Sequence, residues 1–119
     1  MWRKVLLTCG FILIGGSAYA FFLEQQYDFS GAGSGEYQRV FTNSTGSGVS
    51  KQFDTATTTG GPVYLVFGPC SNYIPKWNDD GYVEIPTPTD SRQLVVPANK
   101  CAYLVERGTN GGKGTEEVH

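Results

Sequence analysis

Three acidic side chains, Asp79, Asp80 and Glu84, stand close together in the sequence beside two aromatic residues. Two carboxylates in such a setting could act as a general acid and a general base. Asp-Asp-Gly is more typical of a surface turn, however, and an acid pair with shifted pKa values needs burial that a turn does not supply. The single histidine, His119, stands in a C-terminal segment that we expect to be disordered, so it cannot be held beside a nucleophile. We therefore expect a protein that is not an enzyme.

The same acidic stretch resembles part of a calcium-binding loop. Aligned with the D-x-[DN]-x-[DN]-G pattern, Asn78 and Asp80 fall on the second and third ligand positions. The first ligand position falls on Lys76, whose ammonium cannot replace an oxygen ligand. A turn explains the stretch better, and we expect neither a metal site nor a cofactor.

A long loop over 68–81 and the residue after it mix aromatic and polar side chains. Flat rings beside amides and carboxylates are typical of surfaces that stack on a sugar or anchor a protein partner. Alternatively, Tyr73 and Trp77 fold back over an open end of a small domain and close its core, which we favour because such a domain needs its large side chains for burial. The candidate binding residues are Tyr73, Trp77, Asn78, Asp79, Asp80 and Tyr82.

A glycosylation acceptor pattern, Asn-Ser-Thr, begins at Asn43. It lies in a turn rich in serine and threonine, where such a tripeptide is common by chance. We give it little weight.

Two cysteines flank the most apolar segments of the chain. Residues 61–67 are apolar on both faces and predict a strand buried on both sides. Cys70 follows this strand, and Cys101 lies in the second apolar run, 100–105. We expect a Cys70–Cys101 disulfide, which closes a loop of about 30 residues and contributes roughly 3–4 kcal/mol in the chain-entropy estimate.

The N-terminus has the layout of an export segment. Residues 1–20 combine a basic start, an uncharged apolar run and an A-x-A cleavage site, as in a secretory signal peptide. The alternative is an uncleaved membrane anchor over 5–23, with the domain still outside. Residues 21–35 follow as a flexible neck rich in glycine and serine. We expect a periplasmic, secreted or surface location, with membrane contact only if the segment is retained.

The remaining chain predicts short strands separated by glycine- and proline-containing turns. We expect a domain over 36–107 and a disordered tail over 108–119. The fold class is all-β, a small antiparallel β-sandwich or barrel of about six to seven strands with one disulfide. The expected strands are 36–42, 49–54, 61–67, 82–85, 93–96 and 100–106.

The overall charge is slightly acidic, with a formal net charge of −2. Nucleic acid is therefore an unsuitable partner, because binding a phosphate backbone requires a clustered basic face. We expect a structural or binding subunit of a surface assembly, such as a virion spike, an appendage or a cell-surface complex, with a protein or like subunits as partner. The alternative is a soluble exported binding protein that uses the 68–81 loop to hold a carbohydrate or to inhibit an external enzyme.

Overall fold

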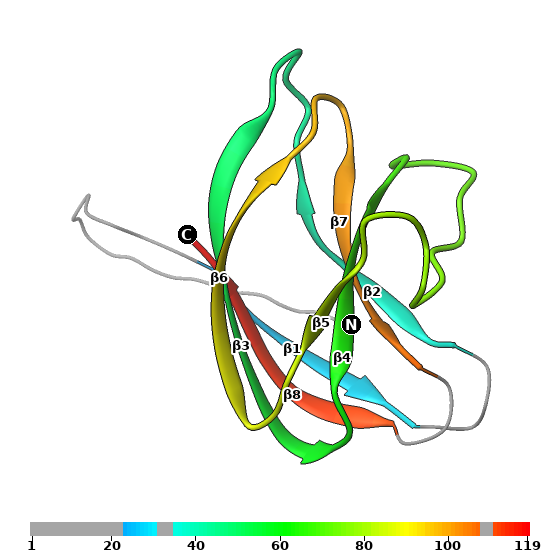
Figure 1. Cartoon of the computed structure of the whole chain (residues 1–119), viewed down its shortest axis with the longest axis vertical. Helices are drawn as coiled ribbons and strands as arrows, with labels where there is room; N and C mark the ends of the chain where they lie inside the picture. Colours follow the sequence, from blue (N-terminus) through cyan, green and yellow to red (C-terminus); the bar gives the residue numbers. More distant parts are fainter. Residues whose placement is uncertain (1–22, 31–34, 108–110) are drawn as a thin grey trace.

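The computed structural model describes residues 23–30, 35–107 and 111–119, and these residues form eight strands and no helix. The strands make two antiparallel sheets of four strands each (Figure 1). We call the sheet of order β1-β8-β3-β6 sheet A and the sheet of order β2-β7-β4-β5 sheet B. The all-β antiparallel class is confirmed, although the described residues contain more strands than the six or seven expected. The strands are β1 (Leu23–Phe29), β2 (Tyr37–Thr42), β3 (Val49–Gly60), β4 (Val63–Gly68), β5 (Val83–Ile85), β6 (Thr89–Val96), β7 (Cys101–Glu106) and β8 (Gly112–Val118).

The two most apolar strands, β4 and β7, are neighbours at the centre of sheet B. They pair antiparallel from Val63 opposite Glu106 to Gly68 opposite Cys101. All six residues of β7 are buried, as are five of the six in β4. Both strands therefore have cover on both faces, as the apolar run over 61–67 predicted for the first of them.

The C-terminal segment expected to be disordered forms a central strand instead. Strand β8 lies between β1 and β3 in sheet A and pairs with both along most of its length. Strand β1 in turn occupies part of the expected 21–35 neck. The prediction of a folded domain limited to 36–107 was therefore wrong at both ends.

Glycine explains why this segment looks disordered yet forms a strand. A Cβ added at Gly114 would lie 1.8 Å from the Ala56 carbonyl oxygen, so only glycine permits β8 to approach β3 there. The pairing register between the two strands shifts at the same place, between Thr57 and Thr59. Glycine lowers the strand propensity of this segment, yet at position 114 it leaves the space that the neighbouring strand β3 needs.

All six expected strands have different bounds in the structure, and the differences are largest in β3 and β6. Strand β3 continues through the threonine-rich connection to Gly60, with Thr55 and Thr57 buried. Strand β6 begins at Thr89 rather than at residue 93, and it pairs with β3 over its whole length. Strand β5 starts at Val83, one residue later than expected. Backbone pairing with a long neighbour decides these bounds more than local apolar pattern does.

The main core lies between the facing sides of the two sheets. Sheet A contributes Tyr27, Phe29, Phe53 and Val96, and sheet B contributes several aliphatic residues. In sheet A, Phe53 and Val96 are fully buried, and in sheet B every contributor except Val40 is fully buried. The two sheets are therefore the layers of a β-sandwich-like fold. The sheet B contributors are Val40, Val63, Leu65, Ile85, Ala102 and Leu104.

The expected signal peptide over 1–20 lies outside the described residues. The alternative anchor over 5–23 reaches them only at Leu23, where β1 begins. Within the part of the chain that the structure describes, no helix is long and apolar enough to cross a membrane.

Candidate functional site

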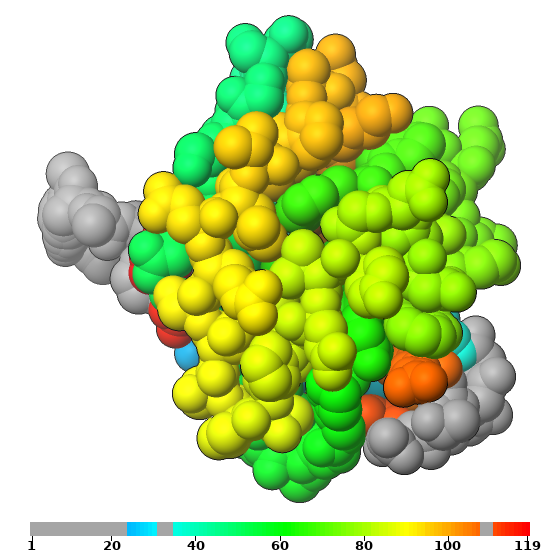
Figure 2. All heavy atoms as spheres, viewed as in Figure 1, coloured from blue at the N-terminus to red at the C-terminus, as the bar shows by residue number. Residues whose placement is uncertain are grey.

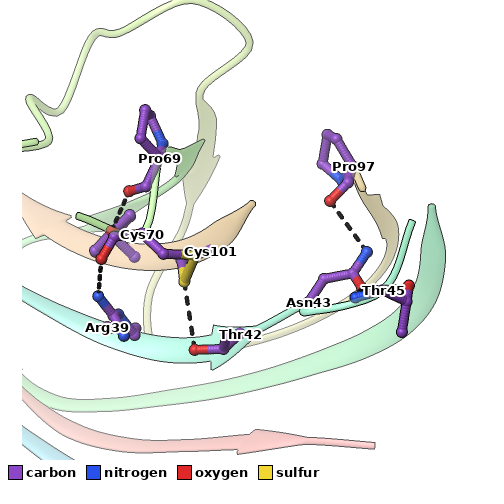
Figure 3. The surroundings of a disulfide bond; sticks show 9 residues. Arg39, Thr42, Asn43, Thr45, Pro69, Cys70, Pro97 and Cys101 are labelled. Carbon is purple, nitrogen blue, oxygen red and sulfur yellow. Dashed lines mark hydrogen bonds between the residues drawn. A yellow bond between two sulfur atoms is a disulfide. The ribbon is translucent and has the colours of Figure 1, made fainter. Parts of the chain in front are cut away.

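The β4–β5 loop (residues 69–82) crosses the outer face of sheet B and is fixed at its start by the disulfide. Cys70 is bonded to Cys101 of β7, with their Cα atoms 5.2 Å apart. The Tyr103 hydroxyl donates to the Pro69 carbonyl at 2.5 Å. The Arg39 guanidinium, from β2, donates to the Cys70 carbonyl (Figure 3). The predicted disulfide is thus confirmed, and it starts a loop that is bound to two strands of sheet B.

The middle of the loop is held by Tyr73 and Asp79. The Tyr73 hydroxyl donates to Asp79 Oδ2 at 2.5 Å, and the Lys76 amide donates to the same oxygen at 3.0 Å. The Tyr73 bond, followed by the Lys76 bond, lowers the pKa of Asp79. Burial, followed by the bond to Asp79, raises the pKa of the Tyr73 phenol. Asp79 therefore acts as the ionised acceptor that closes the turn.

Trp77 belongs to an aromatic cluster on the outer face of sheet B. Its ring centroid lies 5.0 Å from that of Tyr64 and 5.9 Å from that of Tyr82. The Arg107 guanidinium lies 4.7 Å from the Trp77 ring centroid, within cation–π range. We expected Tyr73 and Trp77 to close an open end of the core. They instead cover the outer side of β4 and β7, because residues such as Val66 face that side and need burial.

A hollow of about 460 Å³ lies between this loop and the β6–β7 connection. Figure 2 shows the loop in light green beside that connection in orange. The hollow is lined by the last two residues of β4 together with residues from the loop and the β6–β7 connection. They are Phe67, Gly68, Pro69, Tyr73, Asn78, Asp79, Asp80, Pro97 and Lys100.

The structure divides the six predicted binding residues into two groups. Tyr73, Asn78, Asp79 and Asp80 line the hollow. Trp77 and Tyr82 lie in the ring cluster on Tyr64 instead. Spacing along the loop could not reveal this division, since it depends on which rings fold onto sheet B.

The loop also presents two large apolar side chains to solvent. Ile74 is 67% exposed and Tyr82 is 45% exposed. Asn78 and Asp80 are exposed as well. The surface thus combines apolar anchors with a polar surround, a composition that suits recognition. Among the described residues that line the hollow, none is a histidine, a serine or a free thiol.

The glycosylation pattern falls on a buried asparagine. Asn43 is 2% exposed, and its side-chain nitrogen donates to three backbone carbonyls at 2.9–3.0 Å. Figure 3 shows it directed at Pro97 of the β6–β7 connection. This amide therefore joins the β2–β3 turn to the β6–β7 connection, and its nitrogen is not accessible for modification.

Two glutamates, Glu106 and Glu116, are fully buried. Glu116 Oε1 accepts a hydrogen bond from Thr55 at 2.5 Å, while its other oxygen and both Glu106 oxygens have no hydrogen-bond partner in the described chain. Burial raises the pKa of Glu116 to about 8, the charges of Asp54 and Glu117 add to the increase, and the Thr55 bond opposes it. Glu116 is therefore an acid whose protonated form the interior favours.

A cluster that the sequence did not predict lies on the outer face of sheet A. Asp54, Glu117 and His119 offer ligand atoms that all lie within 4.8 Å of one another. His119 was dismissed as part of a disordered tail, yet its backbone amide donates to the Gln52 carbonyl of β3 at 2.9 Å. The alternation of polar residues at 115, 117 and 119 was the available signal, since a strand places them on one face.

Comparison of this chain with protein-family models, with curated proteins and with solved structures finds no match.

Proposed function

We propose that this chain is a non-catalytic binding subunit of an exported surface assembly, and that the β4–β5 loop is its contact surface for a protein partner. The observation that carries the proposal is the exposure of Ile74 and Tyr82 on a loop that is otherwise firmly fixed. The disulfide supports an extracellular or periplasmic setting, because such bonds persist in oxidising compartments.

The loop is organised before any partner arrives. The Cys70–Cys101 bond fixes its start, the Tyr73–Asp79 hydrogen bond fixes its middle, and the Trp77 ring packs near its end. A preorganised surface loses less conformational entropy on binding than a flexible one does. Rigid support beneath exposed apolar residues therefore favours a recognition role.

The chemistry of the surface fits a protein partner. Ile74 and Tyr82 provide apolar and aromatic contact, while Asn78 and Asp80 provide polar groups around them. Buried aromatic anchors with a polar rim are typical of protein interfaces. The hollow adds a concave area beside these anchors.

The test is a comparison of Ile74→Asp with Val95→Asp. Val95 is 60% exposed on β6 of sheet A, so it matches Ile74 in exposure but lies on the other sheet. We expect Ile74→Asp to abolish recovery of the partner after cross-linking in the surface fraction of the native source, and Val95→Asp to retain it. Both variants must unfold at the parental temperature. Equal recovery with both variants would contradict the proposal.

A carbohydrate ligand is the second candidate, favoured by the hollow with its two aromatic rings and two carboxylates. Its volume of about 460 Å³ falls within the range of small-molecule sites. Isothermal titration calorimetry with oligosaccharides from the surface fraction of the native source distinguishes a carbohydrate ligand from a protein partner. Sugar binding that Asp80→Ala abolishes and Ile74→Asp leaves intact would favour this second candidate.

A further inference from the structure

Three carboxylates lie side by side across the outer face of sheet A. Glu24 of β1 stands opposite Glu117 of β8, and Glu117 stands opposite Asp54 of β3. Ser91 of β6 stands opposite Asp54 and completes the row. Directly opposed like charges destabilise a sheet unless a positive charge offsets them.

His119 brings a nitrogen donor to this row. Its Nε2 lies 3.0 Å from Asp54 Oδ2 and 3.3 Å from Glu117 Oε1. The His119 backbone exchanges two hydrogen bonds with Gln52 of β3, at 2.9 and 3.1 Å, which keeps the residue on the sheet. The chain end therefore lies against β3, as Figure 1 also shows.

Two of the three separations between these donor atoms are close to those of ligands around one ion. Ligands at about 2.0–2.2 Å from Zn²⁺ in a tetrahedral arrangement lie about 3.4 Å from one another. The separations of 3.0 and 3.3 Å from His119 Nε2 are close to that value. The three side chains are about one-third exposed, at 29–33%, so a solvated ion can reach them.

The surroundings also orient the Asp54 carboxylate. The Ser91 hydroxyl donates to Asp54 Oδ1 at 2.5 Å, and Gln52 Nε2 donates to the same oxygen at 3.1 Å. Oδ2 is the oxygen nearer to His119. Hydrogen bonds that orient a ligand in this way are usual around metal sites.

We propose that Asp54, Glu117 and His119 form a binding site for a divalent transition-metal ion of the Zn²⁺ class. An imidazole nitrogen with two carboxylates suits Zn²⁺ better than Ca²⁺ or Mg²⁺, which prefer oxygen ligands throughout. The ion offsets the negative row and joins β3 to the end of β8. Glu24, opposite Glu117, is the nearest further carboxylate in the row. The site lies on sheet A, away from the β4–β5 loop of sheet B, so it stands or falls independently of the proposed function.

The test is a Zn²⁺ titration of the full chain, without an affinity tag, by isothermal titration calorimetry. We expect one Zn²⁺ per chain and a higher unfolding temperature in Zn²⁺, since an ion that binds the folded state stabilises it. His119→Ala and Asp54→Asn are expected to weaken binding roughly tenfold or more. The matched control is Asp28→Asn. Asp28 is a β1 carboxylate opposite Lys113 and lies on the same face of the strand as Glu24. This variant should bind Zn²⁺ as the parent does.

His119 is the only histidine in the sequence, so its ring reports on the site directly. Zn²⁺ should shift the ¹⁵N resonance of His119 Nε2 in saturable fashion, whereas Mg²⁺ should not. Zn²⁺ binding that survives His119→Ala unchanged, or a ring resonance that Zn²⁺ does not move, would overturn the proposal and identify any bound ion as adventitious.

Discussion

Buried carboxyl groups are the unusual feature of this molecule at the scale of single residues. Glu116 lies in the central strand of sheet A with one oxygen bonded to Thr55 and the other without a hydrogen-bond partner in the described chain. Burial raises the pKa of its carboxyl to about 8. Because the ionised form is poorly solvated there, the folded state holds its proton into the neutral range.

This raised pKa predicts that the domain loses stability as the pH rises. The group ionises near 4.5 when unfolded and near 8 when folded, so its contribution is complete below the unfolded pKa. It is lost as the pH rises through about 8, and the difference between 4.5 and about 8 corresponds to roughly 5 kcal/mol. Glu116→Gln removes this titration. From pH 5 to pH 8, a range of about three pH units, the free energy of unfolding of the parent should therefore fall relative to that of the variant.

Urea unfolding in metal-free buffer at several pH values measures this shift. The control is Glu84→Gln, since Glu84 is an exposed carboxylate on β5 and its replacement should leave the pH dependence unchanged. A parallel pH dependence for parent and Glu116→Gln would show that Glu116 ionises normally.

At the scale of elements, the β4–β5 loop depends on a close approach between the Tyr73 ring and Gly68 at the end of β4. A Cβ at Gly68 would lie 2.4 Å from Tyr73 Cε2, and this ring is held by its bond to Asp79 and by packing on Tyr103. The position of the Tyr73 ring therefore requires a glycine at residue 68, a requirement that the apolar pattern of β4 does not reveal.

Gly68→Ala should therefore displace Tyr73 and loosen the loop. We expect a destabilisation of about 1–3 kcal/mol, typical of overpacking, together with weaker partner binding. Chemical denaturation measures the first effect. Gly46→Ala is the matched control, because a Cβ there meets nothing within 4 Å. A Gly68→Ala variant as stable as Gly46→Ala would mean that Tyr73 is not fixed in this position.

At the scale of the whole molecule, the fold is closed by its C-terminal strand. Strand β8 separates β1 from β3 in sheet A, so its removal leaves both without their shared neighbour. The buried face of Tyr27 also loses cover, since that residue stands opposite Gly114.

Deletion of residues 111–119 should therefore prevent cooperative folding. We expect the truncated chain to lose the sharp thermal transition by circular dichroism and the dispersion of amide resonances by NMR. Lys113→Ala, which changes an exposed side chain of the same strand, should unfold as the parent does. A truncated chain that still unfolds cooperatively would restore the hypothesis of a dispensable tail.

The candidate site was only partly predictable from the sequence. Aromatic and acidic residues in a long loop indicated a recognition surface, and four of the six residues do line one hollow. Trp77 lies elsewhere because its ring packs on Tyr64, a residue of another strand. The Asp54–Glu117–His119 cluster was missed because Asp54 is more than sixty residues from the other two members and meets them only through strand pairing.

The sequence by itself determined the all-β class, the central position of β4 and β7 and the Cys70–Cys101 bond, because continuous apolar runs and paired cysteines are local signals. Only the tertiary structure decided that the glycine-rich C-terminal segment is a central strand. Its glycines cost strand propensity locally, yet Gly114 is what allows β8 to pack against Ala56. Strand partners, and with them the sites that join distant residues, depend on such long-range contacts and cannot be read from local pattern.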